Sequence, residues 1–182
     1  GGFHSLALKA DGTVLAWGSN TKGQTNVPAG LTSVVGLAAL STCSAALRAD
    51  GTAVIWGTNT ISGFPLITQP TLTNLVSIAG GGSHLIGLRA NGTVVVWGDN
   101  SYGQASVPIG LSNVVAVCAG LNHTLALKRD GTVVTWGQYT ENARPYPPVP
   151  TYLQLPAGLT NLSMIAAGQN HSAAATANSV YL

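Results

Sequence analysis

Short apolar runs separated by turn residues follow one another along the whole chain. The run 13–17 is rich in β-branched and aromatic residues and the run 6–8 is apolar throughout, as is typical of strands buried on both faces. A further strand is predicted at each of four places: 34–39, 75–79, 114–119 and 162–167. No long segment keeps the helical period of about 3.6 residues. The pattern therefore predicts an all-β protein.

A turn of sequence Asp-Gly-Thr or Asn-Gly-Thr recurs between paired apolar runs. Such a turn is a strong hairpin signal, because both of its central positions favour a positive φ. Asp is also common in turns because it tolerates the left-handed conformation. We therefore expect tight hairpins with these glycines at their tips: Gly12, Gly51, Gly92 and Gly131.

Two further anchors keep the same register as the turns. Six residues after each turn begins stands a Trp-Gly pair, and successive tryptophans are 39, 41 and 39 residues apart: Trp17, Trp56, Trp97 and Trp136. Seven residues before each turn stands His4, Cys43, His84 or His123, and a fifth copy begins with His171. Twelve residues before the last four of these anchors stands a leucine: Leu31, Leu72, Leu111 and Leu159.

Repeats of about 40 residues that contain several strands are typical of a β-propeller. We expect a single propeller segment over residues 1–182, with four-stranded antiparallel blades and a partial fifth repeat from about 159. The tryptophans should lie between adjacent blades. The chain supplies about 4.6 repeats, which predicts a partial or open propeller that belongs to a longer array or is completed by another chain.

The segments 81–88 and 120–127, with the turns and the Trp-Gly pairs, resemble the repeat of the regulator of chromosome condensation family. Leu40 and Cys43 depart from the Gly and His of that repeat. The short repeat is similar to that of bacterial members, among them the propeller-type β-lactamase inhibitor. The resemblance implies a propeller that usually closes with seven blades, and it leaves guanine-nucleotide exchange and β-lactamase inhibition open as functions. Only Phe3 is aromatic among the residues that precede the His/Cys anchors, which argues against the inhibitor.

Composition narrows the classes of function. Apolar residues make up 46% of the chain, which excludes disorder, and no apolar run reaches the roughly 18 residues of a membrane helix. The net charge of +2 gives no support for nucleic-acid binding. Three of the five acidic residues are turn residues, which leaves Asp99 and Glu141 for other purposes. We expect no enzymatic activity and no cofactor.

The histidines recur once per repeat, so they should lie on separate blades. A zinc site needs three or four ligands around one ion, so we expect structural hydrogen bonds inside each blade and no metal. No catalytic acid accompanies Ser5 or Ser172, which argues against a triad. Cys43 and Cys118 occupy different repeat positions, so we expect two buried free thiols.

The basic residues also repeat, since Lys9, Arg48, Arg89 and Lys128 each stand two positions before a turn. We expect them to form a column on one rim, where they either protect hairpin edges from aggregation or meet an acidic partner.

The connectors between repeats carry the predicted partner contacts. The connector 138–158 is the longest and contains five prolines, and stiff loops with Tyr and Arg make good recognition surfaces. The predicted partner-binding residues are Tyr139, Glu141, Arg144, Tyr146, Tyr152, Phe64 and Tyr102.

The function predicted from the sequence is therefore a binding or scaffolding module with a protein partner. The alternative is a subunit that pairs head to tail with copies of itself through open blade edges, which could form filaments. Low charge and abundant Asn, Ser and Thr favour a bacterial extracellular or cell-surface protein.

Overall fold

The computed structural model describes residues 1–57, 73–137, 161–176 and 180–181. Every regular element in them is a strand, as the sequence predicts. The strands are β1 (His4–Leu8), β2 (Val14–Gly18), β3 (Val34–Ala39), β4 (Cys43–Arg48), β5 (Ala53–Gly57), β6 (Leu75–Gly80), β7 (His84–Arg89), β8 (Val94–Gly98), β9 (Val114–Ala119), β10 (His123–Lys128), β11 (Val133–Gly137), β12 (Met164–Ala167), β13 (Ser172–Ala175) and β14 (Val180–Tyr181).

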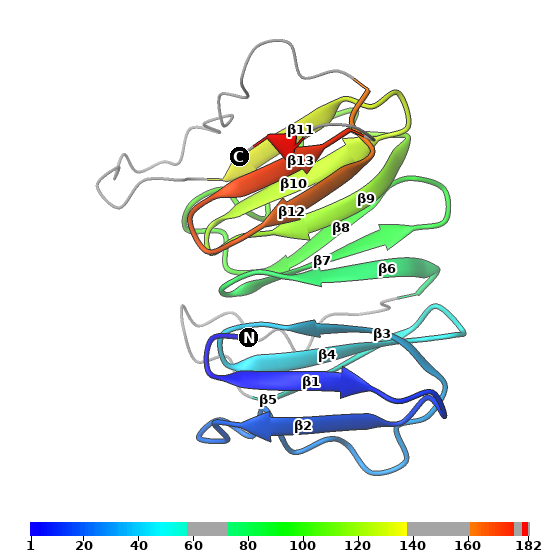
Figure 1. Ribbon diagram of the computed structural model, residues 1–182, viewed down its shortest axis with the longest axis vertical. Coiled ribbons are helices and arrows are strands. Elements are labelled where there is room, and N and C mark those ends of the chain that lie inside the picture. Colours follow the sequence, from blue (N-terminus) through cyan, green and yellow to red (C-terminus); the bar gives the residue numbers. More distant parts are fainter. Residues whose placement is uncertain (58–72, 138–160, 177–179, 182) are drawn as a thin grey trace.

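The strands form five antiparallel sheets, each made of strands adjacent in sequence. We call these sheets units 1 to 5: β1–β2, β3–β4–β5, β6–β7–β8, β9–β10–β11 and β12–β13–β14. Figure 1 shows units 1 and 2 at one end of the molecule, unit 3 in the middle and units 4 and 5 at the other end. The stack is an open arc of propeller-like blades, as the number of repeats predicts.

The described blades differ from the predicted four strands. Unit 1 has two strands and units 2 to 5 have three each. The connectors 19–33 and 99–113 contain no strand, and each carries a proline, which has no backbone donor for a sheet. These connectors are held by turns and by side-chain hydrogen bonds such as the one from Asn20 to Asn26 (2.7 Å).

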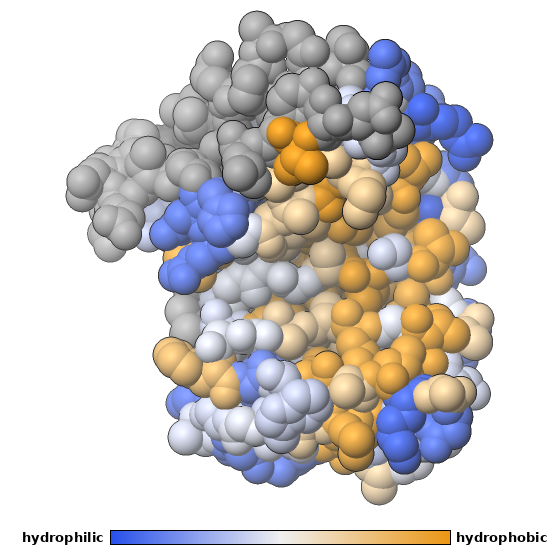
Figure 2. Space-filling view, in the orientation of Figure 1, coloured by the Kyte–Doolittle hydropathy of each residue, from blue (hydrophilic) through white to orange (hydrophobic). Residues whose placement is uncertain are grey.

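The hydrophobic core is divided among the joints between consecutive units. Four clusters of buried residues each combine side chains from two neighbouring units. At the joint of units 3 and 4, Ile86 and Val94 pack with Ala126 and Trp136. Figure 2 shows apolar residues along the middle of one face and polar residues toward its sides. Stability therefore depends on stacking units, as expected for a repeat protein.

Candidate binding rims and the joints between units

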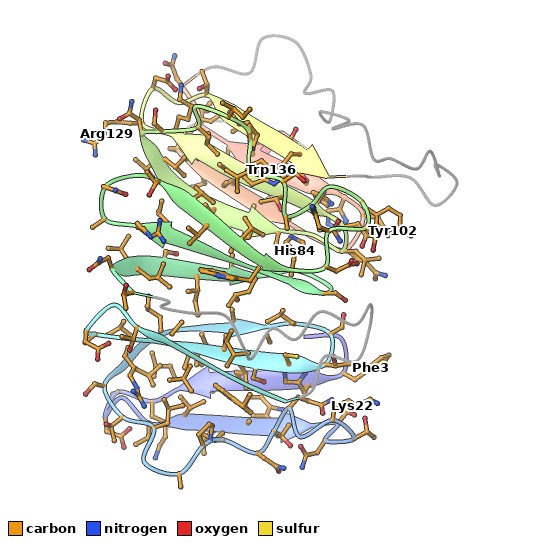
Figure 3. The ribbon with its side chains drawn as sticks, turned by 180° about the vertical axis from the view of Figure 1, so that it is seen from behind. Phe3, Lys22, His84, Tyr102, Arg129 and Trp136 are labelled. Carbon is orange, nitrogen blue, oxygen red and sulfur yellow. The ribbon has the colours of Figure 1, made fainter. Side chains whose placement is uncertain are left out.

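The units present two opposite rims. The turn rim consists of the hairpin turns 9–13, 48–52, 89–93 and 128–132 together with the starts of the strands β3, β6, β9 and β12. Its continuity comes from backbone hydrogen bonds between units, in which the carbonyls of Gly12, Gly51, Gly92 and Gly131 accept from the amide of the next unit's Val34, Leu75, Val114 or Leu162. The connector rim consists of the loops 40–42, 81–83, 120–122 and 168–170 and the points where the connectors begin. Figure 3 shows Arg129 on the turn rim and Phe3, Lys22 and Tyr102 on the opposite side.

The hairpin turns differ from the prediction in one respect. Only the glycine has a positive φ, about +79° at Gly12, and none of the preceding Asp or Asn residues does. The Lys9 amide donates to the Thr13 carbonyl, so the turn has three central residues with glycine last. Asp is therefore not present for its tolerance of the left-handed conformation.

The turn acids instead hold the threonine that follows. Asp11 Oδ1 accepts from the Thr13 amide (2.9 Å) and from its hydroxyl (2.6 Å), and the same bonds form at Asp50 and Asp130. These hydrogen bonds lower the pKa of all three carboxyls. Asn91 makes the same pair of bonds to Thr93 at 3.1 and 2.7 Å, so the turn itself does not need the charge.

The predicted column of basic residues stands on the turn rim. Lys9, Arg48, Arg89 and Lys128 each lie at the end of the strand that enters a hairpin turn. Two of them pair with the acid of their own turn, Lys9 with Asp11 (3.5 Å) and Lys128 with Asp130 (2.9 Å).

The connector rim carries the described aromatic candidates. Phe3 is 82% exposed and Tyr102 is half-buried. Behind Tyr102, the buried Gln104 side chain fixes the connector by accepting from the Tyr102 amide (2.8 Å) and donating to Asp99 (3.2 Å). In the first connector Gln24 holds the Lys22 amide in the same way (2.8 Å). The connectors thus present Lys22 and Tyr102 from a fixed backbone.

Neighbouring units are joined by a hydrogen-bonded chain that starts at the repeat histidine. His4 Nε2 lies 2.9 Å from the Ser44 hydroxyl of unit 2, and that hydroxyl donates to the Gln24 carbonyl (2.6 Å). Because the single hydroxyl proton goes to the carbonyl, His4 must be the donor at Nε2. His84 meets Thr124 (3.0 Å), which donates to Gln104, and His123 meets Ser172 (2.9 Å).

For His4, His84 and His123 the prediction of hydrogen bonds inside their own blade is therefore wrong. Their partners stand one unit further along, because the imidazole points across the joint and not along its own sheet. The tryptophan of the next unit completes the joint, since Trp56 Nε1 donates to the Gln24 carbonyl (2.9 Å) and Trp136 Nε1 to the Gln104 carbonyl (3.0 Å).

Each histidine ring lies against a glycine three residues earlier. A side-chain carbon at Gly81 or Gly120 would overlap the imidazole of His84 or His123. The ring is therefore closely enclosed, and the Nδ1 atoms of His4 and His84 are buried without a hydrogen-bond partner. Close backbone approach explains why glycine precedes the histidine at this spacing.

The joint between units 2 and 3 replaces all three positions together. Leu40 stands for the glycine, Cys43 for the histidine and Leu85 for the hydroxyl, and all three are essentially fully buried in one cluster. The Leu40 side chain packs in this cluster with Cys43 and Leu85. The departures at Leu40 and Cys43 thus form part of a matched apolar joint.

Burial lowers the pKa of the histidines in the polar joints. The pKa of His84 falls to about 4, mainly through desolvation and secondarily through His123. Desolvation also lowers the pKa of His4 and His123. These rings are neutral near pH 7, which fits a structural donor and not a proton-transfer group.

The tryptophans lie between adjacent units, with one exception. Trp136 and Trp56 are buried, at 1% and 6% exposure, and Trp97 is half-buried. Trp17 is 55% exposed, contrary to the prediction. Trp56, Trp97 and Trp136 each pack against the unit before their own, whereas the described residues include no unit before unit 1.

The two thiols are free. Cys43 is buried as predicted, while Cys118 is half-buried. Burial raises the pKa of both, to about 12 at Cys118, so neither thiol is disposed to react near neutral pH.

Most predicted partner-binding residues lie outside the described part of the chain: Phe64, Tyr139, Glu141, Arg144, Tyr146 and Tyr152. Among the described residues no three His, Cys, Asp or Glu side chains gather as metal ligands. Within the same residues no helix is long and apolar enough to cross a membrane.

Sequence reasoning missed the hydroxyl that completes each polar joint. It stands directly after the His/Cys anchor, at Ser44, Thr124 and Ser172, with Leu85 as the exception. The unit before Leu85 is the one that carries Cys43 in place of histidine. Comparing the His/Cys anchor of each unit with the residue that follows the anchor in the next unit would have revealed this pairing.

Comparison with known proteins agrees with this geometry. The family model of the regulator of chromosome condensation (RCC1) repeat matches residues 1–24, 75–104 and 114–141. Prp20p of Saccharomyces cerevisiae, from a study of its binding to Gsp1p and histones, matches over the whole chain with 25% identity and a TM-score of 0.78. The chain is an RCC1-like repeat protein.

Other solved structures show the same fold. Yeast RCC1 (Prp20) with Kap60 bound matches all of this RCC1-like chain with 26% identity and a TM-score of 0.77. The ectodomain of the Physcomitrella patens receptor kinase CR4 matches 97% of it with 27% identity and a TM-score of 0.69, over 45% of that ectodomain. No curated protein matches the chain in sequence. The chain spans about half of the two yeast structures, 55% and 54% of their lengths.

Proposed function

We propose that this RCC1-like chain is a non-enzymatic module that binds a protein partner through its connector rim. The observation that carries the proposal is the position of the exposed Phe3 and the half-buried Tyr102 on that rim, beside connectors that buried glutamines hold in place. Aromatic side chains that reach the surface from a fixed backbone bind protein surfaces at low entropic cost.

The long connectors support the same rim. The strands β5 and β11 end at Gly57 and Gly137, beside the loops that carry Thr42 and Asn122. In sequence, the connectors 58–72 and 138–160 follow directly after these strands. They contain the other predicted contact residues, which are aromatic or charged.

The neighbours supply the classes of partner to test. Published structures concern binding of the yeast protein to Gsp1p, histones and Kap60. A β-lactamase serves as a fourth probe, because the short repeats resemble those of the propeller-type β-lactamase inhibitor. We further propose, from composition alone, that the protein belongs to a bacterial cell surface or extracellular space.

Binding of immobilised full chain to Gsp1p, a histone dimer, Kap60 and a β-lactamase, measured by interferometry, tests the proposal. We expect at least one probe to bind, and a variant with Phe3→Ser and Tyr102→Ser to bind it about tenfold or more weakly, a loss of about 1.4 kcal/mol. Replacing the connector 138–158 by that of the third repeat should weaken binding further. Asp50→Asn, on the turn rim, is the matched control. Equal binding by wild type and both connector-rim variants would place the contact elsewhere and refute the proposal.

A further inference from the structure

The turn rim carries the whole net charge of the protein. Its turns hold five basic residues and three acidic ones: Lys9, Arg48, Arg89, Lys128 and Arg129 against Asp11, Asp50 and Asp130. The remaining charged residues, Lys22 and Arg144 against Asp99 and Glu141, cancel. The formal charge of +2 is therefore located on one rim.

The excess charge is confined to units 3 and 4. In units 1 and 2 each turn has one basic and one acidic residue, at Lys9 and Asp11 and at Arg48 and Asp50. In unit 3 the acid is replaced by Asn91, which leaves Arg89 without a carboxylate in its turn. Arg89 forms no ion pair within the described residues.

In unit 4 a second basic residue is added. Arg129 stands where the other turns have Ala10, Ala49 and Ala90. It is exposed and forms no ion pair in the described part of the chain, while Lys128 pairs with Asp130. Units 3 and 4 thus each gain one positive charge relative to the repeat.

The fold does not require either departure. Asn91 makes the same hydrogen bonds to Thr93 as the aspartates make in the other turns. The Arg129 amide donates to the Asn113 carbonyl (2.8 Å), just as the Ala49 amide donates to Ser33 (2.9 Å). The two substitutions change the charge of the rim and leave its backbone bonds unchanged.

Exposed valines lie between these charges. The pairing register slips by one residue at the start of β3, β6 and β9, and the residues left out of register are Val35, Val76 and Val115. They are 57%, 55% and 44% exposed. The Val114 amide donates to the Gly92 carbonyl in the turn of unit 3, and the Asn113 carbonyl accepts from the Arg129 amide in the turn of unit 4. Val115, the next residue, therefore lies between the two basic turns.

We propose that Arg89, Val115, Lys128 and Arg129, with Val76 beside them, form a second docking surface, which binds an acidic segment of another protein that also carries aliphatic side chains. Charge complementarity selects carboxylates, and the valines offer apolar contact between them. A protein segment fits better than nucleic acid, because a phosphate backbone gains nothing from the valines and an excess of two charges is small for it.

Two substitutions can test this docking surface without risk to the fold, because they restore residues found in the other turns. Asn91→Asp and Arg129→Ala each place in one turn the residue that other turns of this chain already hold. The probe is a short labelled peptide of alternating glutamate and valine, titrated with the full chain at low salt by fluorescence anisotropy. Its counterpart with glutamine in place of glutamate and a single-stranded oligonucleotide serve as comparison ligands.

We expect the acidic peptide to bind and the glutamine peptide not to bind. Each restoring variant should weaken binding about threefold, and the double variant about tenfold, because exposed charge pairs contribute roughly 0.2–1 kcal/mol each. Val115→Ser should weaken it as well, and added salt should reduce it. Lys22→Ala removes a positive charge from the opposite rim and should have no effect.

Three results would overturn the proposal: no binding of the acidic peptide, equal binding by the restoring variants, or tighter binding of the oligonucleotide. Phe3→Ser with Tyr102→Ser should leave peptide binding intact, so failure here and failure of the connector-rim function can be told apart.

Discussion

Single residues in this protein derive their roles from the unit beside them. Trp136 is 1% exposed, packs on unit 3 and donates to the Gln104 carbonyl, whereas Trp17 has the same sequence context and is 55% exposed. Asn91 and Asp130 stand at the same turn position and make the same bonds to threonine, so they differ only in charge. A repeat position thus fixes local geometry, and the neighbouring unit fixes burial.

The two tryptophans should respond differently to truncation. Trp136→Ala removes a fully buried side chain and leaves a cavity, so the free energy of unfolding should fall by about 3–5 kcal/mol. Trp17→Ala should cost about 1 kcal/mol or less, since over half of the side chain already contacts solvent. Urea unfolding followed by circular dichroism measures both. Equal losses would mean that Trp17 is covered in solution.

At the level of elements, the joints between units exist in two chemical versions. Three joints use a glycine, a histidine and a hydroxyl, while the joint of units 2 and 3 uses Leu40, Cys43 and Leu85. In the polar version the imidazole fills the space beside the glycine, and in the apolar version Leu40 packs with Cys43 and Leu85. The three positions should therefore be exchangeable only as a set.

Transplanting the apolar joint into units 3 and 4 tests this coupling. Gly81→Leu alone should destabilise by about 2–3 kcal/mol, because the new side chain overlaps the His84 ring and the Gly120 carbonyl oxygen. Adding His84→Cys and Thr124→Leu should recover the part of that loss that comes from the His84 ring, so the effects are non-additive. Gly2→Leu, where a side chain meets only ordinary contacts, is the control. Simple addition of the single effects in urea unfolding would contradict the coupling.

The polar joints should also make stability depend on pH. His4, His84 and His123 bind protons more weakly in the folded protein than in the unfolded chain, whose histidine pKa is near 6.5. As the pH falls below 6.5, the unfolded chain takes up protons first, so the free energy of unfolding decreases toward pH 4. For His84 alone the loss is about 3 kcal/mol.

Unfolding free energies at several pH values between 7 and about 4 check this expectation. The triple variant that lacks His84 should show a shallower slope than wild type over the same range. The turn aspartates, whose pKa values are lowered from 3.8, lose their contribution only at more acidic pH and do not interfere. An unchanged slope in the triple variant would show that His84 is not responsible.

For the whole molecule, the open arc leaves one end with unmatched apolar surface. Phe3, Leu15 and Trp17 are all more than half exposed on unit 1. The strand β1 pairs only with β2, although its counterparts β4, β7, β10 and β13 are each central in a sheet of three. Unpaired strand edges beside apolar side chains favour association.

We therefore expect the 182-residue chain to self-associate. Size-exclusion chromatography with light scattering should give masses above the 18.4 kDa of the monomer. Replacing Leu15 and Trp17 by serine should shift the population toward monomer, because it removes the apolar surface beside the free edge. Ile109→Ser, which changes a fully exposed side chain elsewhere, should not. A well-folded wild-type monomer at all concentrations would contradict the expectation.

The sequence by itself determined the repeating architecture of this protein. Anchors at fixed spacing predicted the strands, with β3 and β9 matching residue by residue, because turn chemistry and alternating apolar runs act locally. It also placed the basic column on one rim, since equivalent positions in a repeat take equivalent places.

Only the tertiary structure decided what lies across each joint. It showed that His84 bonds to Thr124 one unit away, that Leu85 replaces this hydroxyl beside Cys43, and that Trp17 is more than half exposed. It also showed that the described connectors 19–33 and 99–113 contain no fourth strand. The reason is physical: local sequence fixes backbone conformation, whereas burial and hydrogen-bond partners depend on which surfaces the stacking of units brings together.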